Sequence, residues 1–196
     1  MKNRFKGTKG TIIIIILVCL VVSYYYYLSN KTVTNKNEED LKPSSVKEIL
    51  MKNYETTYPP TPKEVVKEFL QISKVLHNEK LTDDEIEAVG LKILELYDDE
   101  LVANKTQEDY ITDLKSEIAT FRSNDYVITN YFASQSTEVV YGKVNGYDCA
   151  KLYGTFSIRA GGKASTLTEV FILRKDAAGH WKIFGWQPVE DNDSDE

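Results

Sequence analysis

The chain has 196 residues, and its 24 Lys and Arg against 30 Asp and Glu give a formal net charge of −6. This acidic balance argues against nucleic acid as a partner, because a polyanion is repelled by a negatively charged surface. Two cysteines exclude a scaffold built on several disulfides, and the sequence contains no metal-ligand spacing and no glycine-rich phosphate loop.

Residues 12–28 are the most apolar stretch of the chain, beginning with five isoleucines and ending with four tyrosines and Leu28. A helix of this length rises about 25 Å, close to a hydrocarbon core of roughly 30 Å. Tyrosine rings favour the headgroup level, and the run of β-branched residues has no polar face. We therefore predict a transmembrane helix over residues 12–28 that anchors the chain in a membrane.

The charges around this helix predict its direction. Four basic residues precede it, namely Lys2, Arg4, Lys6 and Lys9. The first turn after it is uncharged, so the positive-inside rule makes residues 1–11 a cytoplasmic basic tail and puts the rest of the chain outside the cell membrane. A cleaved signal peptide is the alternative, but no small-x-small cleavage site follows Val22.

Residues 29–42 are polar and aperiodic, so we predict a solvated tether to an external domain over residues 43–189. Helical signals come first in this domain, each a capping residue followed three positions later by an acid. The predicted helices begin near Ser45, at Pro62, at Asp83 and after Thr106, and the second and third run to Asn78 and Tyr97. Acids at the C-terminal end of a helix are unfavourable, so either the third helix ends earlier or Asp98 caps a new turn. The simpler expectation, which we favour, is that Asp98, Asp99 and Glu100 form a solvated turn.

After Asn124 the apolar period changes from about 3.6 to 2, which indicates strands. The predicted strands cover residues 126–133, 138–144, 147–160, 164–175 and 180–189. Asn145-Gly146 and Gly161-Gly162 are predicted turns between them. Helices followed by such a meander predict an α+β domain, with helices packed on one face of a curved, cone-like antiparallel sheet. Residues 190–196 form a predicted acidic tail.

The last predicted hairpin, residues 168–188, has an apolar strand and a charged, glycine-containing turn before Trp181-Lys182-Ile183. This hairpin, together with the helices over 62–78 and 83–97, resembles the nuclear transport factor 2-like superfamily, also called the cystatin-like cone. The resemblance implies a cone-shaped domain that hosts many unrelated functions. With its anchor, the chain is similar to uncharacterised membrane-anchored envelope proteins of Gram-positive bacteria and to inner-membrane scaffold subunits of type IV secretion machines.

Enzymes of this superfamily use an Asp, His or Tyr inside the cone as acid or base. The two histidines have ordinary structural explanations, because His77 ends a helix and His180 lies at a hairpin turn. We predict no catalytic residues, no cofactor and no metal, and hence no enzyme. An isolated, buried carboxylate beside a tyrosine hydroxyl would argue the opposite.

Glu169 is a candidate polar group in a pocket, because it alternates with Leu167 and Phe171 and so shares their apolar face. Its carboxylate could face a pocket and have a raised pKa. The alternative, which we favour, is an ion pair between Glu169 and Arg159 on the neighbouring strand.

Three aromatic residues, Tyr153, Phe184 and Trp186, fall on the strand phase opposite Trp181 and Ile183. A sheet with rings on both faces needs cover on both, so these residues predict a ligand or partner surface. A local bulge that turns the rings into the core is the equal alternative.

The leading hypothesis is a single-pass, extracytoplasmic binding or scaffold module of the bacterial envelope. Its external domain would pair with itself as a homodimer or with another envelope protein. The alternative is a small-ligand receptor that uses the cone as an apolar pocket, with Glu169 or a tyrosine as its polar contact. A pocket filled by side chains would exclude this alternative.

Overall fold

A computed structural model of the chain describes residues 45–189. Within this part, none of the helices has the length and apolarity that crossing a bilayer requires. The predicted transmembrane helix, its cytoplasmic tail, the tether and the acidic tail lie outside the described residues and stay predictions.

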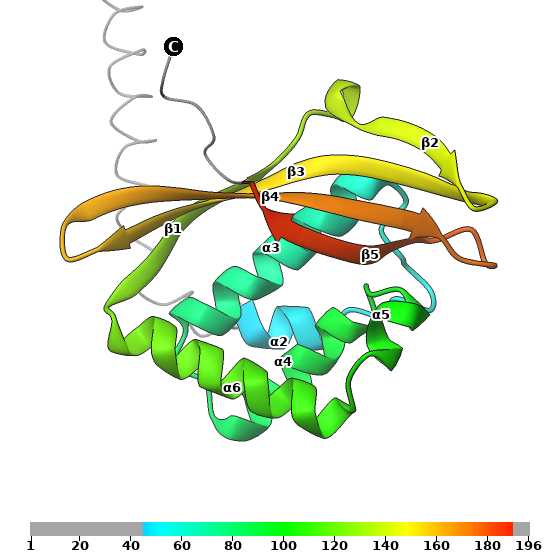
Figure 1. The fold of residues 1–196 in the computed structure, drawn as a ribbon. Coiled ribbons are helices and arrows are strands. Elements are labelled where there is room, and N and C mark those ends of the chain that lie inside the picture. Colours follow the sequence, from blue (N-terminus) through cyan, green and yellow to red (C-terminus); the bar gives the residue numbers. More distant parts are fainter. Residues whose placement is uncertain (1–44, 190–196) are drawn as a thin grey trace, which may run out of the picture. The chain divides into compact units, whose positions relative to one another are not determined.

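The described residues form an α+β domain whose helices gather on one face of an antiparallel sheet (Figure 1). The helices are α2 (Ser45–Leu50), α3 (Pro62–Asn78), α4 (Asp83–Leu94), α5 (Asp99–Ala103) and α6 (Gln107–Ser123). The strands are β1 (Tyr126–Ala133), β2 (Val140–Val144), β3 (Tyr147–Ala160), β4 (Lys163–Lys175) and β5 (Trp181–Pro188), with the 3-10 helix η1 (Ser136–Glu138) before β2. The predicted α+β class is confirmed.

Threonine residues cap the N-termini of the three longer helices. Their hydroxyls accept hydrogen bonds from the first backbone amides, which have no partner within the helix. Thr61, Thr82 and Thr106 accept from the amide three positions on, at 3.3, 3.3 and 3.1 Å. Each cap of this kind stabilises a helix by about 1 kcal/mol. The helices therefore begin where their capping residues predict.

The sheet has the order β1-β3-β4-β5, and β2 pairs with the N-terminal part of β3. The long central strands β3 and β4 are joined at Gly161 and Gly162, which both have the positive φ that favours glycine. Their inward side chains meet the helices in one core, in which Leu70, Leu152 and Phe171 are fully buried.

Helix α4 ends earlier than predicted, because the residues after it run beside β5. The Ile183 amide donates to the Leu96 carbonyl and the Asp98 amide donates to the Ile183 carbonyl, both at 2.9 Å. Asp98 is consequently buried and caps α5, where Arg174 binds its carboxylate. The predicted solvated turn is wrong at Asp98, and the alternatives, an earlier helix end and a cap at Asp98, are correct. This short parallel bridge fixes Tyr97 against the inner face of the sheet.

A bulge in β5 changes which face its aromatic residues occupy. Ile172 lies opposite Gly185 but Leu173 lies opposite Ile183, so Phe184 is the extra residue. Beyond the bulge Trp186 lies opposite Phe171 and shares its inward face. The prediction of an outward Trp186 is therefore wrong, and the bulge alternative is correct for it.

A second irregularity, in β1, is held by α3. The Asn78 amide nitrogen donates to the Ile128 carbonyl at 2.8 Å, and the Ile128 amide donates back to the Asn78 oxygen at 2.9 Å. Lys74 donates to the carbonyl of Thr129, the residue at the register shift. These contacts fix the edge of the sheet that borders the cavity described next.

Candidate ligand cavity

A cavity of about 610 Å³ lies between the helices and the inner face of the sheet. Small-molecule sites typically have volumes of roughly 300–1,000 Å³. The walls are mainly apolar and include Phe69, Leu76, Ile93, Leu114, Phe121, Ile128, Phe156, Leu167 and Trp186. Side chains therefore do not fill the space between the helices and the sheet, and the condition that would have excluded a small-ligand receptor is not met.

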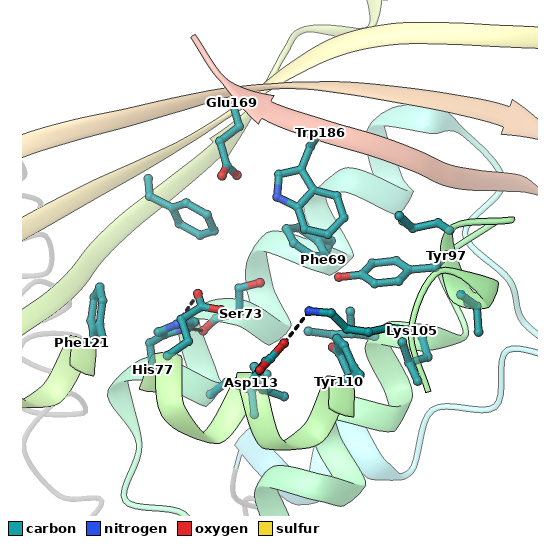
Figure 2. Close-up of a pocket in the computed structure, with 18 of the residues that line it drawn as sticks. Phe69, Ser73, His77, Tyr97, Lys105, Tyr110, Asp113, Phe121, Glu169 and Trp186 are labelled. Carbon is teal, nitrogen blue, oxygen red and sulfur yellow. Dashed lines mark hydrogen bonds and ion pairs between the residues drawn. The ribbon is translucent and has the colours of Figure 1, made fainter. Parts of the chain in front are cut away.

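Aromatic rings form one end of the cavity. Trp186 lies with its ring centroid 5.3 Å from those of Phe69 and Tyr97, and Phe69 contacts Phe171 at 5.4 Å. Gly154 permits this packing, because a Cβ there would lie 2.7 Å from the Phe171 ring. The cluster gives the cavity an aromatic wall (Figure 2).

Glu169 projects from β4 into this cavity, as Figure 2 shows, and its side chain is buried. It lies opposite Gly154 on β3 and Pro188 on β5, neither of which carries a group that could neutralise it. Among residues 45–189 its carboxylate has no hydrogen bond and no ion pair. Burial, followed by the negative charge of Glu117, raises the pKa of Glu169 to about 7.

The favoured ion pair between Glu169 and Arg159 is wrong. The register places Arg159 opposite Ala164, five positions from Glu169 along β4. Side chains alternate between the faces of a strand, so Arg159 also belongs to the outer face. The carboxylate in a pocket, which was the other expectation for Glu169, is what the structure contains.

Two tyrosine hydroxyls lie across the cavity from the sheet. Tyr110 donates to the Gly90 carbonyl at 3.5 Å, and its ring lies edge-on to that of Tyr97, with the ring centroids 6.4 Å apart. Burial raises the pKa of both tyrosines well above the ordinary value, so both keep their protons at neutral pH. They offer neutral hydrogen-bonding groups to a ligand.

Charged residues border the open side of the cavity. His77 Nδ1 lies 2.7 Å from the Ser73 carbonyl, and Nε2 lies 3.3 Å from Glu117. The hydrogen bond to His77 lowers the pKa of Glu117, so that carboxylate keeps its charge. Lys105 and Asp113 form an exposed ion pair of 2.5 Å. Among the described residues, no group of three His, Cys, Asp or Glu side chains could hold a metal ion.

The cavity includes only two of the five predicted site residues, Glu169 and Trp186. Tyr153, Arg159 and Phe184 lie outside it; Tyr153 and Phe184 are each 41 % exposed. They border a sheet face that none of the helices in residues 45–189 covers (Figure 1). The predicted outward direction of Tyr153 and Phe184 is thus correct.

The sequence prediction missed Tyr97 and Tyr110 as cavity residues, although each belongs to the apolar stripe of a predicted helix. A hydroxyl on a core-facing stripe was the available signal, because a buried hydroxyl needs a partner. The predicted structural role of His77 is consistent with its bond to the Ser73 carbonyl, but the ring also lines the cavity.

Comparison with known protein families gives a match. The chain matches, over residues 1–186, a family described as a domain of unknown function, and it belongs to that family. The family is DUF6715. No curated protein matches the chain.

One solved structure with some similarity is the NMR solution structure of TraH, described as a transfer protein from the Gram-positive conjugative plasmid pIP501. The two chains are 12% identical, and the match covers 69% of this chain and 98% of TraH with a TM-score of 0.35. A score this low establishes neither a shared fold nor a shared function.

Proposed function

We propose that this chain is a membrane-anchored binding module of the bacterial envelope, and that its external domain holds a small, largely apolar ligand in the cavity. The observation that carries the proposal is a 610 Å³ apolar cavity into which the buried, unpartnered Glu169 carboxylate projects. Residues 12–28 would supply the anchor, with the N-terminus in the cytoplasm.

The energetics of the cavity support a ligand. An open cavity forfeits the dispersion contacts that a filled core would have, and this loss destabilises the fold. A carboxylate in apolar surroundings adds a further cost wherever water is excluded from it. Both costs fall when a ligand fills the space and contacts the carboxylate. Cavities with these two features are the usual binding sites of proteins.

We further propose that the domain is related to the nuclear transport factor 2-like superfamily. Helices that precede an antiparallel sheet and enclose a cavity against one of its faces support this relationship. A role as a subunit resembling type IV secretion inner-membrane scaffolds is the alternative within the same superfamily, and it would use protein partners instead of a small ligand.

The test is native mass spectrometry of the gently purified full chain. We expect an added mass of a few hundred daltons on the wild-type chain. Ser73→Phe should abolish it, because Ser73 is buried and lines the cavity. Ser157→Phe, the same change on the outward phase of β3, should retain it. A wild-type chain without added mass, or an adduct that survives Ser73→Phe, would contradict the proposal.

A protein partner on the outer face of the sheet is a second candidate function. Phe132 is 56 % exposed and lies on the same outward phase as Tyr153, while Phe184 is exposed near them on β5. A photo-crosslinking amino acid in place of Tyr153 should then capture a second copy or an envelope protein in cells. The same amino acid in place of Glu87, exposed on α4, is the control and should capture nothing specific.

Catalysis has one observation in its favour, since an isolated carboxylate and tyrosine hydroxyls share the cavity. We nevertheless propose binding, because the negative charges of Glu117 and Glu169 oppose the build-up of negative charge on a substrate. A ligand incubated in excess with the chain should therefore be recovered with its mass unchanged. Conversion to another mass that depends on Glu169 would establish an enzyme.

A further inference from the structure

We propose that the ligand of this cavity is an organic cation, an apolar molecule whose ammonium group binds the Glu169 carboxylate among the surrounding aromatic rings. The inference rests on the proposed ligand-binding function and specifies the chemistry of the ligand. Three observations carry it, namely the charges that face the cavity, the position of the rings around Glu169 and the absence of a cation beside it in the described residues.

The charges that line the cavity sum to a negative value. Its carboxylates are Glu169 on β4 and Asp113 and Glu117 on α6, whereas its one ammonium is Lys105. Lys105 is already bound to Asp113 at the open side, where the two side chains are 54% and 63% exposed. His77 on α3 directs its imidazole to Glu117. No described cation is left for Glu169, so a cationic ligand is attracted and an anionic ligand is repelled.

The register of the sheet surrounds Glu169 with aromatic rings. On the inward face of β4 its neighbours two positions away are Leu167, which pairs with Phe156, and Phe171, which pairs with Trp186. Gly154 lies directly across, and the Phe171 ring packs in the space that a side chain there would fill. An ammonium bound to the carboxylate would therefore lie among aromatic rings, whose faces attract cations in desolvated sites.

The ionisation of Glu169 links this binding to pH. Its pKa of about 7 means that the carboxyl is largely neutral in acid and charged above pH 7. The groups that face it are Glu117 from α6, whose charge raises this pKa, and the protonated Tyr97 hydroxyl. A cation favours the charged carboxylate, so its affinity should fall about tenfold per pH unit below pH 7. Above pH 8 its affinity should be constant, since the carboxylate is then fully charged.

The experiment uses three probes of one shape, 4-phenylbutylamine, 4-phenylbutanol and 4-phenylbutyrate, titrated calorimetrically into the full chain at pH 8. We expect the amine to bind at least tenfold more tightly than the alcohol, and the carboxylate to bind most weakly. Glu169→Gln should bring the amine to the affinity of the alcohol. Glu87→Gln, the same change at an exposed position of α4, should leave the order intact.

The outcomes separate this inference from the proposed function. Equal affinity for amine and alcohol, or an amine preference that survives Glu169→Gln, would overturn the proposal that the ligand is a cation. Binding of the alcohol would still support the proposal that the cavity binds a ligand. Failure of all three probes to bind, together with a wild-type chain that carries no added mass, would overturn both proposals. Retained binding of the alcohol by Glu169→Gln would show that the variant is folded.

Discussion

The domain contains two buried carboxylates that differ in every respect except burial. Asp98 is 5 % exposed and receives two hydrogen bonds from Arg174, at 2.5 and 2.6 Å, and one from the Glu100 amide at 2.9 Å. Glu169 is 9 % exposed and receives none from residues 45–189. Asp98 joins α5 to the sheet edge, and Glu169 projects into open space.

The two environments shift the pKa values in opposite directions. Burial acts to raise the pKa of Asp98, but the hydrogen bonds from Arg174 and the Glu100 amide lower it below the ordinary value. Glu169 has only the effect of burial and of a neighbouring negative charge, so its pKa rises. Removing the partner of a buried carboxylate destabilises the fold, whereas a carboxylate that lacks a partner costs stability while it is charged.

Removal of the Asp98 partner should give the largest loss of stability. Arg174→Ala leaves Asp98 buried without its hydrogen-bonded counter-ion, a change that typically costs about 3–5 kcal/mol. It also removes the guanidinium from between the Tyr147 and Phe184 rings, 4.4 and 4.6 Å away. Urea unfolding of the full chain measures the loss. Arg159→Ala, an exposed arginine of β3, should change the unfolding free energy by less than about 0.5 kcal/mol. Equal losses in both variants would mean that Asp98 does not depend on its partner.

Neutralisation of Glu169 should increase the stability of the folded chain, in contrast to removal of the Asp98 partner. Because its pKa is higher in the folded chain, at about 7 against an ordinary 4.5, the folded chain binds the proton more tightly. Stability should therefore fall as pH rises from about 4.5 to 7 and stay constant above that. Full charging costs about 3 kcal/mol on this basis. Glu169→Gln should be more stable than the wild type at pH 8 and equal to it near pH 4.

The measurement is urea unfolding of both chains between pH 4 and pH 8 without added ligand. A Glu169→Gln chain that is less stable than wild type at pH 8 would show that a favourable partner for the carboxylate exists in the folded chain. Asp98 supplies the internal contrast. Its lowered pKa gives a stabilisation that is present above its ordinary pKa and lost as pH falls through the folded value.

The same contrast explains how much of the molecule the sequence could predict. Local signals are strong where they concern one element, so the threonine caps and the long strands were predicted within about one residue. The inward phase of Glu169 was also predictable, because alternation depends on neighbours in the same strand. The absence of a partner for Glu169 was not predictable, because the register between β3 and β4 decides which side chains lie beside it.

Two other features depended on contacts between distant segments. The end of α4 is set by hydrogen bonds between Leu96, Asp98 and Ile183, residues almost ninety positions apart in the sequence. The bulge at Phe184 moved Trp186 to the cavity, and a single inserted residue of this kind leaves no mark on an alternating pattern. Both errors concerned the cavity, because several elements must meet there.

The smallest expected effect separates the two causes of the raised Glu169 pKa. Burial is the larger cause and the charge of Glu117 the second, so Glu117→Gln should lower the pKa of Glu169 only part of the way from about 7 toward its ordinary value. Carbon-detected NMR titration of the Glu169 carboxyl carbon measures this directly. Glu87→Gln should leave the titration unchanged, since that carboxylate lies at an exposed position on α4. A complete return to the ordinary pKa in Glu117→Gln would mean that repulsion, and not burial, sets the ionisation of Glu169. The pKa values of Asp98 and Glu169 would then differ only because their neighbouring charges differ. The cavity would in that case solvate the Glu169 carboxylate as well as water does.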